Sequence, residues 1–206
     1  MEKTALLIFQ KNPELGKVKT RLAAGIGEQK ALEIYRALIQ VTLQEAEKSG
    51  FDLYVYYSSF IPEQIDSFGF RACLQNGKDL GDRIENAFRD IFSWGYSKAM
   101  IIGTDCPELS ADILLEAARQ LEENEVVIGP AEDGGYYLLG LKAFHPQLFR
   151  SIAWSTGSVL KETLARAKAF RLKTSLLISL SDLDTEDDLK SLLDKSPVWR
   201  KRIGWE

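Results

Sequence analysis

Short apolar runs and segments with helical spacing alternate along this chain of 206 residues. Short apolar runs predict buried strands, whereas apolar residues three and four positions apart predict helices that pack on a sheet. Their alternation is typical of βαβ units and of a mainly parallel sheet. The predicted strands cover residues 4–10, 52–58, 70–74, 98–103, 125–130, 135–142 and 171–180.

Segments with helical spacing lie between most of these strands. The first predicted helix runs from about Glu28 to Ser49, where Gly50 is placed to end it. The pattern predicts one domain over residues 1–206, an α/β fold with three α/β/α layers and a mainly parallel, mixed sheet. Trp199 and Trp205 in the tail are expected to pack back on this domain. The other helices are predicted at Leu80–Trp94, Ser110–Glu123, Ser158–Ala169 and Thr185–Lys195.

Composition narrows the class of protein. Hydrophobic residues make up 45% of the chain and charged residues 27%, as in ordinary globular proteins. The net charge of −4 argues against a nucleic-acid partner, because such binding depends on many lysines and arginines. The sequence has no apolar run long enough for a signal peptide or a membrane span, so no membrane partner is expected. Cys73 and Cys106 are then interpreted as reduced thiols of a cytoplasmic protein, whose oligomeric state the sequence leaves open.

A carboxylate follows the apolar strand that ends near Ile102. Asp105 stands in the segment Gly103-Thr104-Asp105-Cys106-Pro107. Open α/β sheets bind ligands beyond the carboxyl ends of their strands, and Mg²⁺ or Mn²⁺ carrying substrate phosphates needs hard oxygen ligands. We therefore predict that Asp105 is a metal ligand; the alternative is a turn residue that starts the next helix.

A basic segment follows the first strand. Between Lys11 and Leu22, the cations Lys17, Lys19 and Arg21 occupy alternate positions, and an extended backbone would project all three to one side. The segment fits neither a Walker loop nor a Rossmann fingerprint, so phosphates would be held by side-chain charge. The alternative is a solvated basic loop without a ligand.

Two acidic segments follow later strands. In Gly129–Tyr137, Glu132 and Asp133 precede two glycines, and either carboxylate is a candidate general base. Asp-Gly is also a strong hairpin signal, which is compatible with that role. Asp182 and Asp184 fall on one face of an extended chain, and Asp184 is the predicted second metal ligand. The alternative is that this acidity belongs to a helix cap at Thr185.

Two further loops are candidate walls of a binding site. Gln75, Gly81 and Arg83 lie in one of them, where they could shape a pocket or only lead into a capped helix. Trp154 begins the other, which could close over an acceptor or lead into the next helix.

Six ordered motifs resemble one family. They are Lys-x-Pro-x-x-Gly-x-x-Lys-Thr-Arg-Leu, Asp-Leu-Gly-x-Arg, Gly-Thr-Asp-x-Pro, Gly-Pro-Ala-x-Asp-Gly-Gly-Tyr, Trp-Ser-Thr and Asp-x-Asp-Thr-x-x-Asp-Leu. Over residues 5 to about 190 the chain is similar to the radical-SAM/selenodomain-associated transferase 1 family, which belongs to the glycosyltransferase A-type nucleotide-diphospho-sugar transferases. The resemblance implies their Rossmann-like fold, nucleotide phosphates held by Lys11 to Arg21, and a divalent metal held by Asp105 and Asp184. The Lys-Thr-Arg-Leu element also resembles phospholactate guanylyltransferases.

We therefore predict a transferase that uses Mg²⁺ or Mn²⁺, a nucleoside-diphosphate sugar and a small-molecule acceptor. Lys19 is expected to assist the leaving diphosphate, and Asp133 or Glu132 to deprotonate the acceptor. The alternatives are a nucleotidyltransferase that releases pyrophosphate and a non-catalytic nucleotide-binding domain. The predicted nucleotide-binding residues are Lys11, Lys17, Lys19, Thr20, Arg21, Gln75, Gly81 and Arg83, and the predicted substrate-binding residues are Gly134, Gly135, Tyr136 and Trp154.

Overall fold

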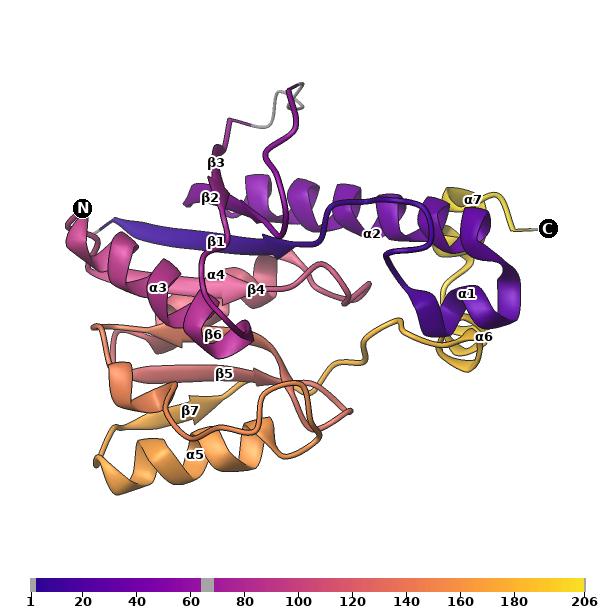
Figure 1. Cartoon of the computed structure of the whole chain (residues 1–206). Helices are drawn as coiled ribbons and strands as arrows, with labels where there is room; N and C mark the ends of the chain where they lie inside the picture. Colours follow the sequence, from indigo (N-terminus) through magenta and orange to yellow (C-terminus); the bar gives the residue numbers. More distant parts are fainter. Residues whose placement is uncertain (1–2, 64–68, 206) are drawn as a thin grey trace.

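A seven-stranded sheet forms the centre of the protein in the computed structural model, which describes residues 3–63 and 69–205 (Figure 1). The strand order is β3-β2-β1-β4-β6-β5-β7, and β6 runs antiparallel to both of its neighbours while every other pairing is parallel. The strands are β1 (Thr4–Gln10), β2 (Asp52–Tyr57), β3 (Arg71–Leu74), β4 (Lys98–Ile102), β5 (Val126–Pro130), β6 (Tyr136–Leu141) and β7 (Thr174–Leu176).

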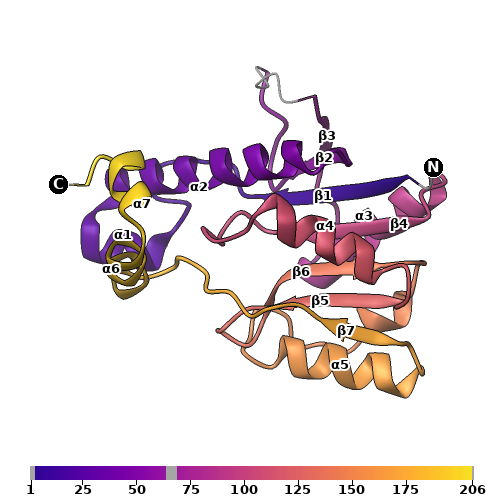
Figure 2. The same cartoon turned by 180° about the vertical axis from the view of Figure 1, so that it is seen from behind.

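Helices cover both faces of this sheet. In Figure 1, α3 and α5 lie in front of it, and the reverse view in Figure 2 shows α2 and α4 on the opposite face. The predicted three-layer α/β/α architecture is thus confirmed. The helices are α1 (Thr20–Ile26), α2 (Glu28–Lys48), α3 (Leu80–Ser93), α4 (Ala111–Gln120), α5 (Val159–Ala169), α6 (Glu186–Lys195) and α7 (Pro197–Arg202), with a short 3-10 helix, η1 (Pro146–Leu148).

The apolar runs of the strands are continuous because both faces of the sheet are buried. Along β1, Leu6 and Ile8 face the hydrophobic core under α2, while Ala5 and Leu7 face the core under α3. The central strand β1 therefore contributes to two cores, one on either side of the sheet.

Two predicted elements differ in the structure. The strand predicted over 171–180 is limited to Thr174–Leu176, since the chain after it only makes separate contacts, such as the N–H of Leu180 donating to Pro130 O at 3.1 Å. The predicted extended segment around Arg21 is the short helix α1. This helix has no side-chain cap, so its sequence carries little signal, and its contacts with α2 and α6 stabilise it instead.

The C-terminal tail packs back on the protein, as predicted. Trp199 in α7 is buried, and Trp205 packs against the core with Lys30 Nζ lying 5.7 Å from its ring centroid. Within the described part of the chain, each helix is too short or too polar to cross a bilayer.

The carboxyl ends of β1 to β5 lie at one edge of the sheet, and β6 starts there. The α1, α6 and α7 helices project beyond this edge at the right of Figure 1. The loops that carry the predicted site therefore converge between the sheet and these three helices.

Candidate functional site

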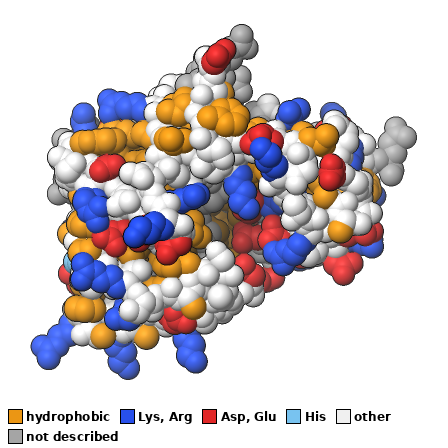
Figure 3. Space-filling view, in the orientation of Figure 1, with side chains coloured by type: hydrophobic (Ala, Val, Ile, Leu, Met, Phe, Trp, Pro, Cys, Tyr) orange, Lys and Arg blue, Asp and Glu red, His pale blue; other side chains and the backbone are white. Residues whose placement is uncertain are grey.

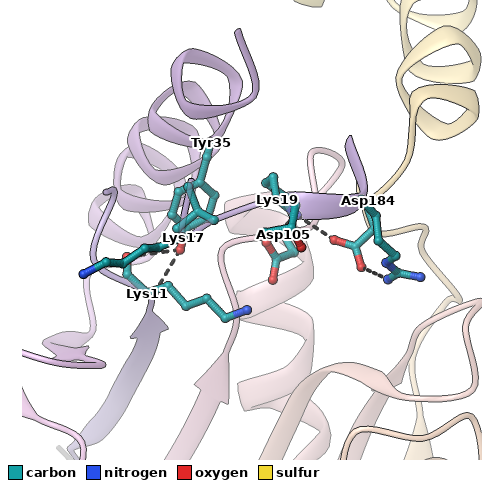
Figure 4. A pocket seen from close by; sticks show the side chains of 9 residues that line it. Lys11, Lys17, Lys19, Tyr35, Asp105 and Asp184 are labelled. Atoms are coloured by element: carbon teal, nitrogen blue, oxygen red, sulfur yellow. Dashed lines mark hydrogen bonds and ion pairs between the residues drawn. The ribbon is translucent and has the colours of Figure 1, made fainter. Parts of the chain in front are cut away.

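Lys19 lies between two carboxylates from distant parts of the chain (Figure 4). Its Nζ is 2.5 Å from Oδ1 of Asp105, after β4, and 2.9 Å from Oδ1 of Asp184, before α6. It also donates to the backbone oxygen of Leu183 at 2.6 Å. The predicted metal ligands thus lie side by side, and a lysine from the basic segment joins them.

The local backbone places Lys19 at this point. Lys19 precedes α1 in a left-handed conformation with φ 49° and ψ 43°, which costs a non-glycine residue about 1 kcal/mol or more. The N–H of Leu183 donates to Asp105 O at 2.9 Å, so the two acidic segments are also joined through their backbones. The ion pairs and the α1 packing therefore hold an otherwise unfavourable conformation.

The charges of this cluster stabilise one another. Burial alone lowers the pKa of Lys19, but Asp105 and Asp184 outweigh it, so the pKa lies above its usual value. Burial likewise raises the pKa of Asp184, but Lys19 and then Arg21 outweigh it and hold the pKa below its usual range. The ammonium and the Asp184 carboxylate therefore stay charged at neutral pH.

Tyr35 supports the cluster from α2. Its hydroxyl accepts a hydrogen bond from the N–H of Lys11 at 3.0 Å and lies 3.1 Å from Oγ1 of Thr104. Burial and then the charge of Asp105 raise the pKa of Tyr35, so the hydroxyl stays protonated. Tyr35 falls within the helix predicted from Glu28 to Ser49, and only the meeting of three segments reveals its polar role.

A small pocket of about 190 Å³ lies against the cluster. Lys17 is exposed and pairs with Glu14 at 2.7 Å, Lys19 is buried, and Arg21 in α1 pairs with Asp184. The expected extended backbone through these three cations is therefore wrong, but all three still line one pocket. Its lining comprises Lys11, Lys17, Val18, Lys19, Thr20, Arg21, Tyr35, Asp105 and Asp184.

A larger cleft of about 1030 Å³ adjoins this pocket, and Lys11, Arg21, Tyr35 and Asp105 line both. The face in Figure 3 is hollowed between the sheet and the α1 side, with acidic and basic side chains at the rim. The sequence candidates that line the cleft are Lys11, Arg21, Gln75, Arg83, Asp105, Asp133, Gly135, Tyr136 and Trp154.

One end of the cleft is formed by the loop between β3 and α3. Gln75 Nε2 donates to the backbone oxygen of Tyr56 at 2.9 Å, and Arg83 Nε donates to Gly77 O at 3.3 Å. Asp79 caps α3 by accepting from the N–H of Asp82 at 2.8 Å. The capping interpretation is therefore confirmed, and Gln75 and Arg83 also line the cleft.

Asn12 links the segments that follow β1 and β2 at the rim of the cleft. It is 3% exposed, and its Oδ1 accepts from the N–H of Ser59 at 2.9 Å while its Nδ2 donates to Phe60 O at 2.8 Å. Its own N–H donates to Oγ of Ser58 at 3.1 Å. No sequence pattern singles out this residue beyond its place in the basic segment.

Trp154 and Tyr136 form an aromatic wall of the large cleft. Trp154 packs so closely on Gly81 that a Cβ atom at position 81 would lie 2.0 Å from the indole Nε1. The ring of Tyr136 meets Trp154 edge to face at 6.5 Å between centroids. Gly81 thus leaves the space that the Trp154 indole occupies. The hydroxyl of Tyr136 is buried, so Tyr136 can offer only its ring to a ligand.

In the β5–β6 turn, the two candidate bases have different surroundings. The predicted hairpin is present, and Gly134 needs its φ of 88° and its lack of a Cβ, which would lie 2.1 Å from Gly157 O. Asp133 lines the cleft and accepts from the N–H of Gly135 at 2.8 Å. Glu132 does not line it; its carboxylate instead accepts from Oγ of Ser181 at 2.6 Å.

Asp182 is a further acidic group that lines the cleft. The sequence pattern indicated only that it lies on the same face of the chain as Asp184. Burial, followed by the charges of Asp105 and Asp133, raises the pKa of Asp182 to about 7. The capping box of Thr185 and Asp188 is also present, so the alternative interpretation of this acidic segment holds alongside the site.

The site residues fit a cation. Asp105, Asp184 and the Leu183 carbonyl are hard oxygen donors that already surround one, the Lys19 ammonium. Among the described residues, no group of three or more His, Cys, Asp or Glu side chains could hold a metal ion. A divalent metal would therefore have two protein carboxylates and would need substrate phosphates or water for its other ligands.

Comparisons with known proteins agree with this architecture. A family model described as "Uncharacterized protein conserved in bacteria (DUF2064)" matches residues 42–156. The solved "putative nucleotide-diphospho-sugar transferase" from Desulfovibrio desulfuricans G20 is 33% identical, with a TM-score of 0.89 over 98% of this chain and 91% of that protein. No curated protein sequence matches the chain.

More distant solved structures share the fold alone. Rv0371c from Mycobacterium tuberculosis H37Rv is 15% identical, with a TM-score of 0.61 over 94% of this chain and 99% of its own. The same protein has been solved in complex with manganese. The 4-diphosphocytidyl-2C-methyl-D-erythritol synthase from Anaerococcus prevotii DSM 20548 is 10% identical, with a TM-score of 0.60 over 92% of this chain and 96% of that protein. The predicted fold of nucleotide-diphospho-sugar transferases is thereby confirmed.

Proposed function

We propose that this chain, which belongs to the DUF2064 family of bacterial proteins, is a metal-dependent transferase that takes a sugar from a nucleoside-diphosphate donor. The observation that carries the proposal is the convergence of Lys19, Asp105 and Asp184 on one cation-lined pocket beside a large cleft. The name of the 33% identical protein from Desulfovibrio desulfuricans supports the same reaction class.

The small pocket suits the diphosphate of such a donor. Four cations and two carboxylates line it, so it carries net positive charge. Lys11 and Arg21 would bind the phosphate oxygens, and such fixed charges stabilise the negative charge that develops on a leaving diphosphate. A divalent ion held by Asp105 and Asp184 would add to that neutralisation.

The large cleft would hold the rest of the donor and the acceptor. Gln75 and Arg83 at the β3 end offer amide and guanidinium groups to a nucleoside. Trp154 and Tyr136 offer aromatic surface toward a sugar ring. Asp133 is the proposed base for the acceptor hydroxyl, because Glu132 is engaged with Ser181 outside the cleft.

Two acidic groups of the cleft favour a neutral acceptor. Asp133 and Asp182 both line the cleft, and they are near enough for the charge of Asp133 to help raise the pKa of Asp182. The cations of the cleft, Lys11, Arg21 and Arg83, come from other segments. A phosphorylated acceptor beside Asp133, as a nucleotidyltransferase would use, would be repelled by this carboxylate, whereas a neutral hydroxyl compound that Asp133 deprotonates would not. This supports sugar transfer over nucleotidyl transfer.

The proposal is tested by incubating the protein with Mn²⁺ and panels of nucleotide sugars and nucleoside triphosphates, and analysing the products. Release of a nucleoside diphosphate from a nucleotide sugar supports it. Pyrophosphate release from a triphosphate points to nucleotidyl transfer instead. If no nucleotide shifts the thermal unfolding midpoint with or without Mn²⁺, donor binding is contradicted and the result argues for a non-catalytic domain.

A further inference from the structure

The ammonium group of Lys19 lies inside a cage of three oxygen atoms. Oδ1 of Asp105, the Leu183 carbonyl and Oδ1 of Asp184 are 2.5, 2.6 and 2.9 Å from Nζ. The Lys19 side chain is 3% exposed, whereas those of Asp105 and Asp184 are 45% and 35% exposed. The two carboxylates therefore share one buried cation, and Oδ2 of Asp184 is also paired with Arg21. Both side chains nevertheless line the small pocket.

A divalent ion bound to both carboxylates would compete for the same oxygens. It would also lie beside the Lys19 ammonium, which forms ion pairs with both carboxylates. Like charges this close repel each other, and more strongly where one of them is buried, as the Lys19 side chain is. The metal and the ammonium group thus oppose each other at this site.

We propose that Lys19 is a built-in competitor of the metal: it neutralises Asp105 and Asp184 in the free protein, and releases them when a nucleotide phosphate gives its ammonium another partner. The inference rests on the proposed function, because it takes the small pocket to bind a diphosphate. Lys19 lines that pocket, so a phosphate bound there lies within reach of the same group. Metal and nucleotide binding then strengthen each other reciprocally.

The oxygen ligands that the protein offers to a metal ion support the same inference. The free protein offers a metal two carboxylates, and one oxygen of each already accepts from Lys19. Magnesium is usually held in proteins by one or two carboxylates together with substrate phosphates. Nucleotide binding would therefore supply the missing ligands and remove the competing ammonium in one step.

The test measures the binding of Mn²⁺ alone by electron paramagnetic resonance of the free ion. Lys19→Met keeps the length of the side chain and removes its charge, so we expect Mn²⁺ to bind at least about tenfold more tightly than to wild type. Lys19→Arg keeps the charge and should bind as weakly as wild type. Lys11→Met is the matched control: it removes a cation from the same pocket that forms no ion pair with either carboxylate among the described contacts, and its affinity should stay within about threefold.

Equal Mn²⁺ affinity of wild type and Lys19→Met, with both folded, overturns the inference. An equal gain in Lys11→Met also overturns it, because the effect would then be a general one of net charge. Should Lys19→Met fail to fold, the wild type alone decides: a dissociation constant for Mn²⁺ below about 100 µM contradicts the inference, and a higher one supports it. Since no nucleotide is present, a failed sugar-transfer assay leaves these outcomes unchanged.

Discussion

The indole of Trp154 rests directly on Gly81, although Gly81 lies in the first turn of α3 and Trp154 in the loop before α5. A Cβ atom on Gly81 would lie 2.0 Å from Nε1 and 2.5 Å from Cε2 of that ring, closer than unbonded atoms can approach. The side chain of Trp154 therefore holds its place in the cleft only while residue 81 is a glycine.

Gly81→Ala should displace the indole. We expect a change in tryptophan fluorescence and a loss of about 1–3 kcal/mol in the free energy of unfolding, because the added methyl group overpacks the contact. Gly103→Ala is the matched control, since a Cβ there meets nothing within 4 Å. Gly81→Ala is also made in a Trp154→Phe background. If it changes the fluorescence there as much as in the wild type, the change does not come from Trp154.

Asp133→Asn should lower the rate of sugar transfer by about 10²-fold or more, the usual contribution of a general base. Glu132→Gln should keep the rate within about threefold, since its carboxylate lies outside the cleft beside Ser181. The measurement is single-turnover transfer from the donor found in the product assay. Equal losses in the two variants would contradict the assignment of Asp133 as the base.

Asn12→Ala should lower the free energy of unfolding by about 1–2 kcal/mol, because the N–H of Ser59 and the carbonyl of Phe60 lose their hydrogen bonds to the buried Asn12 side chain. Urea denaturation measures the change. Asn76→Ala is the control for an exposed asparagine in a neighbouring loop and should stay within about 0.5 kcal/mol. A similar small change in both variants would show that Asn12 does not fasten the rim.

Tyr35→Phe should cost about 1–2 kcal/mol of unfolding free energy, since the buried hydroxyl joins Lys11 to Thr104. A double-mutant cycle with Thr104→Val isolates the contact between the two hydroxyl groups. We expect the double variant to lose less than the sum of the single variants. Strict additivity would mean that the 3.1 Å contact contributes no stability.

The hydrophobic pattern by itself determined the layered fold. Continuous apolar runs such as Leu6–Ile8 belong to strands that are buried on both faces, and amphipathic stretches such as Glu28–Lys48 form helices that cover them. The spacing of apolar residues is therefore enough to tell these strands from these helices. The same pattern does not predict α1. This helix has one buried residue and no side-chain cap, and its contacts with α2 and α6 decide its conformation.

The sequence also determined which chemical groups the site holds, because the position of Asp105 after a strand places it at the ligand-binding edge. Only the tertiary structure decided how those groups pair. Lys19 is 165 residues from Asp184 in the chain, and the spacing of neither segment shows that the ammonium of Lys19 lies between the two carboxylates. Such contacts depend on how separate loops meet in space, so local patterns carry no record of them, and the same reason hid Tyr35, Asn12 and the seat of Trp154 on Gly81.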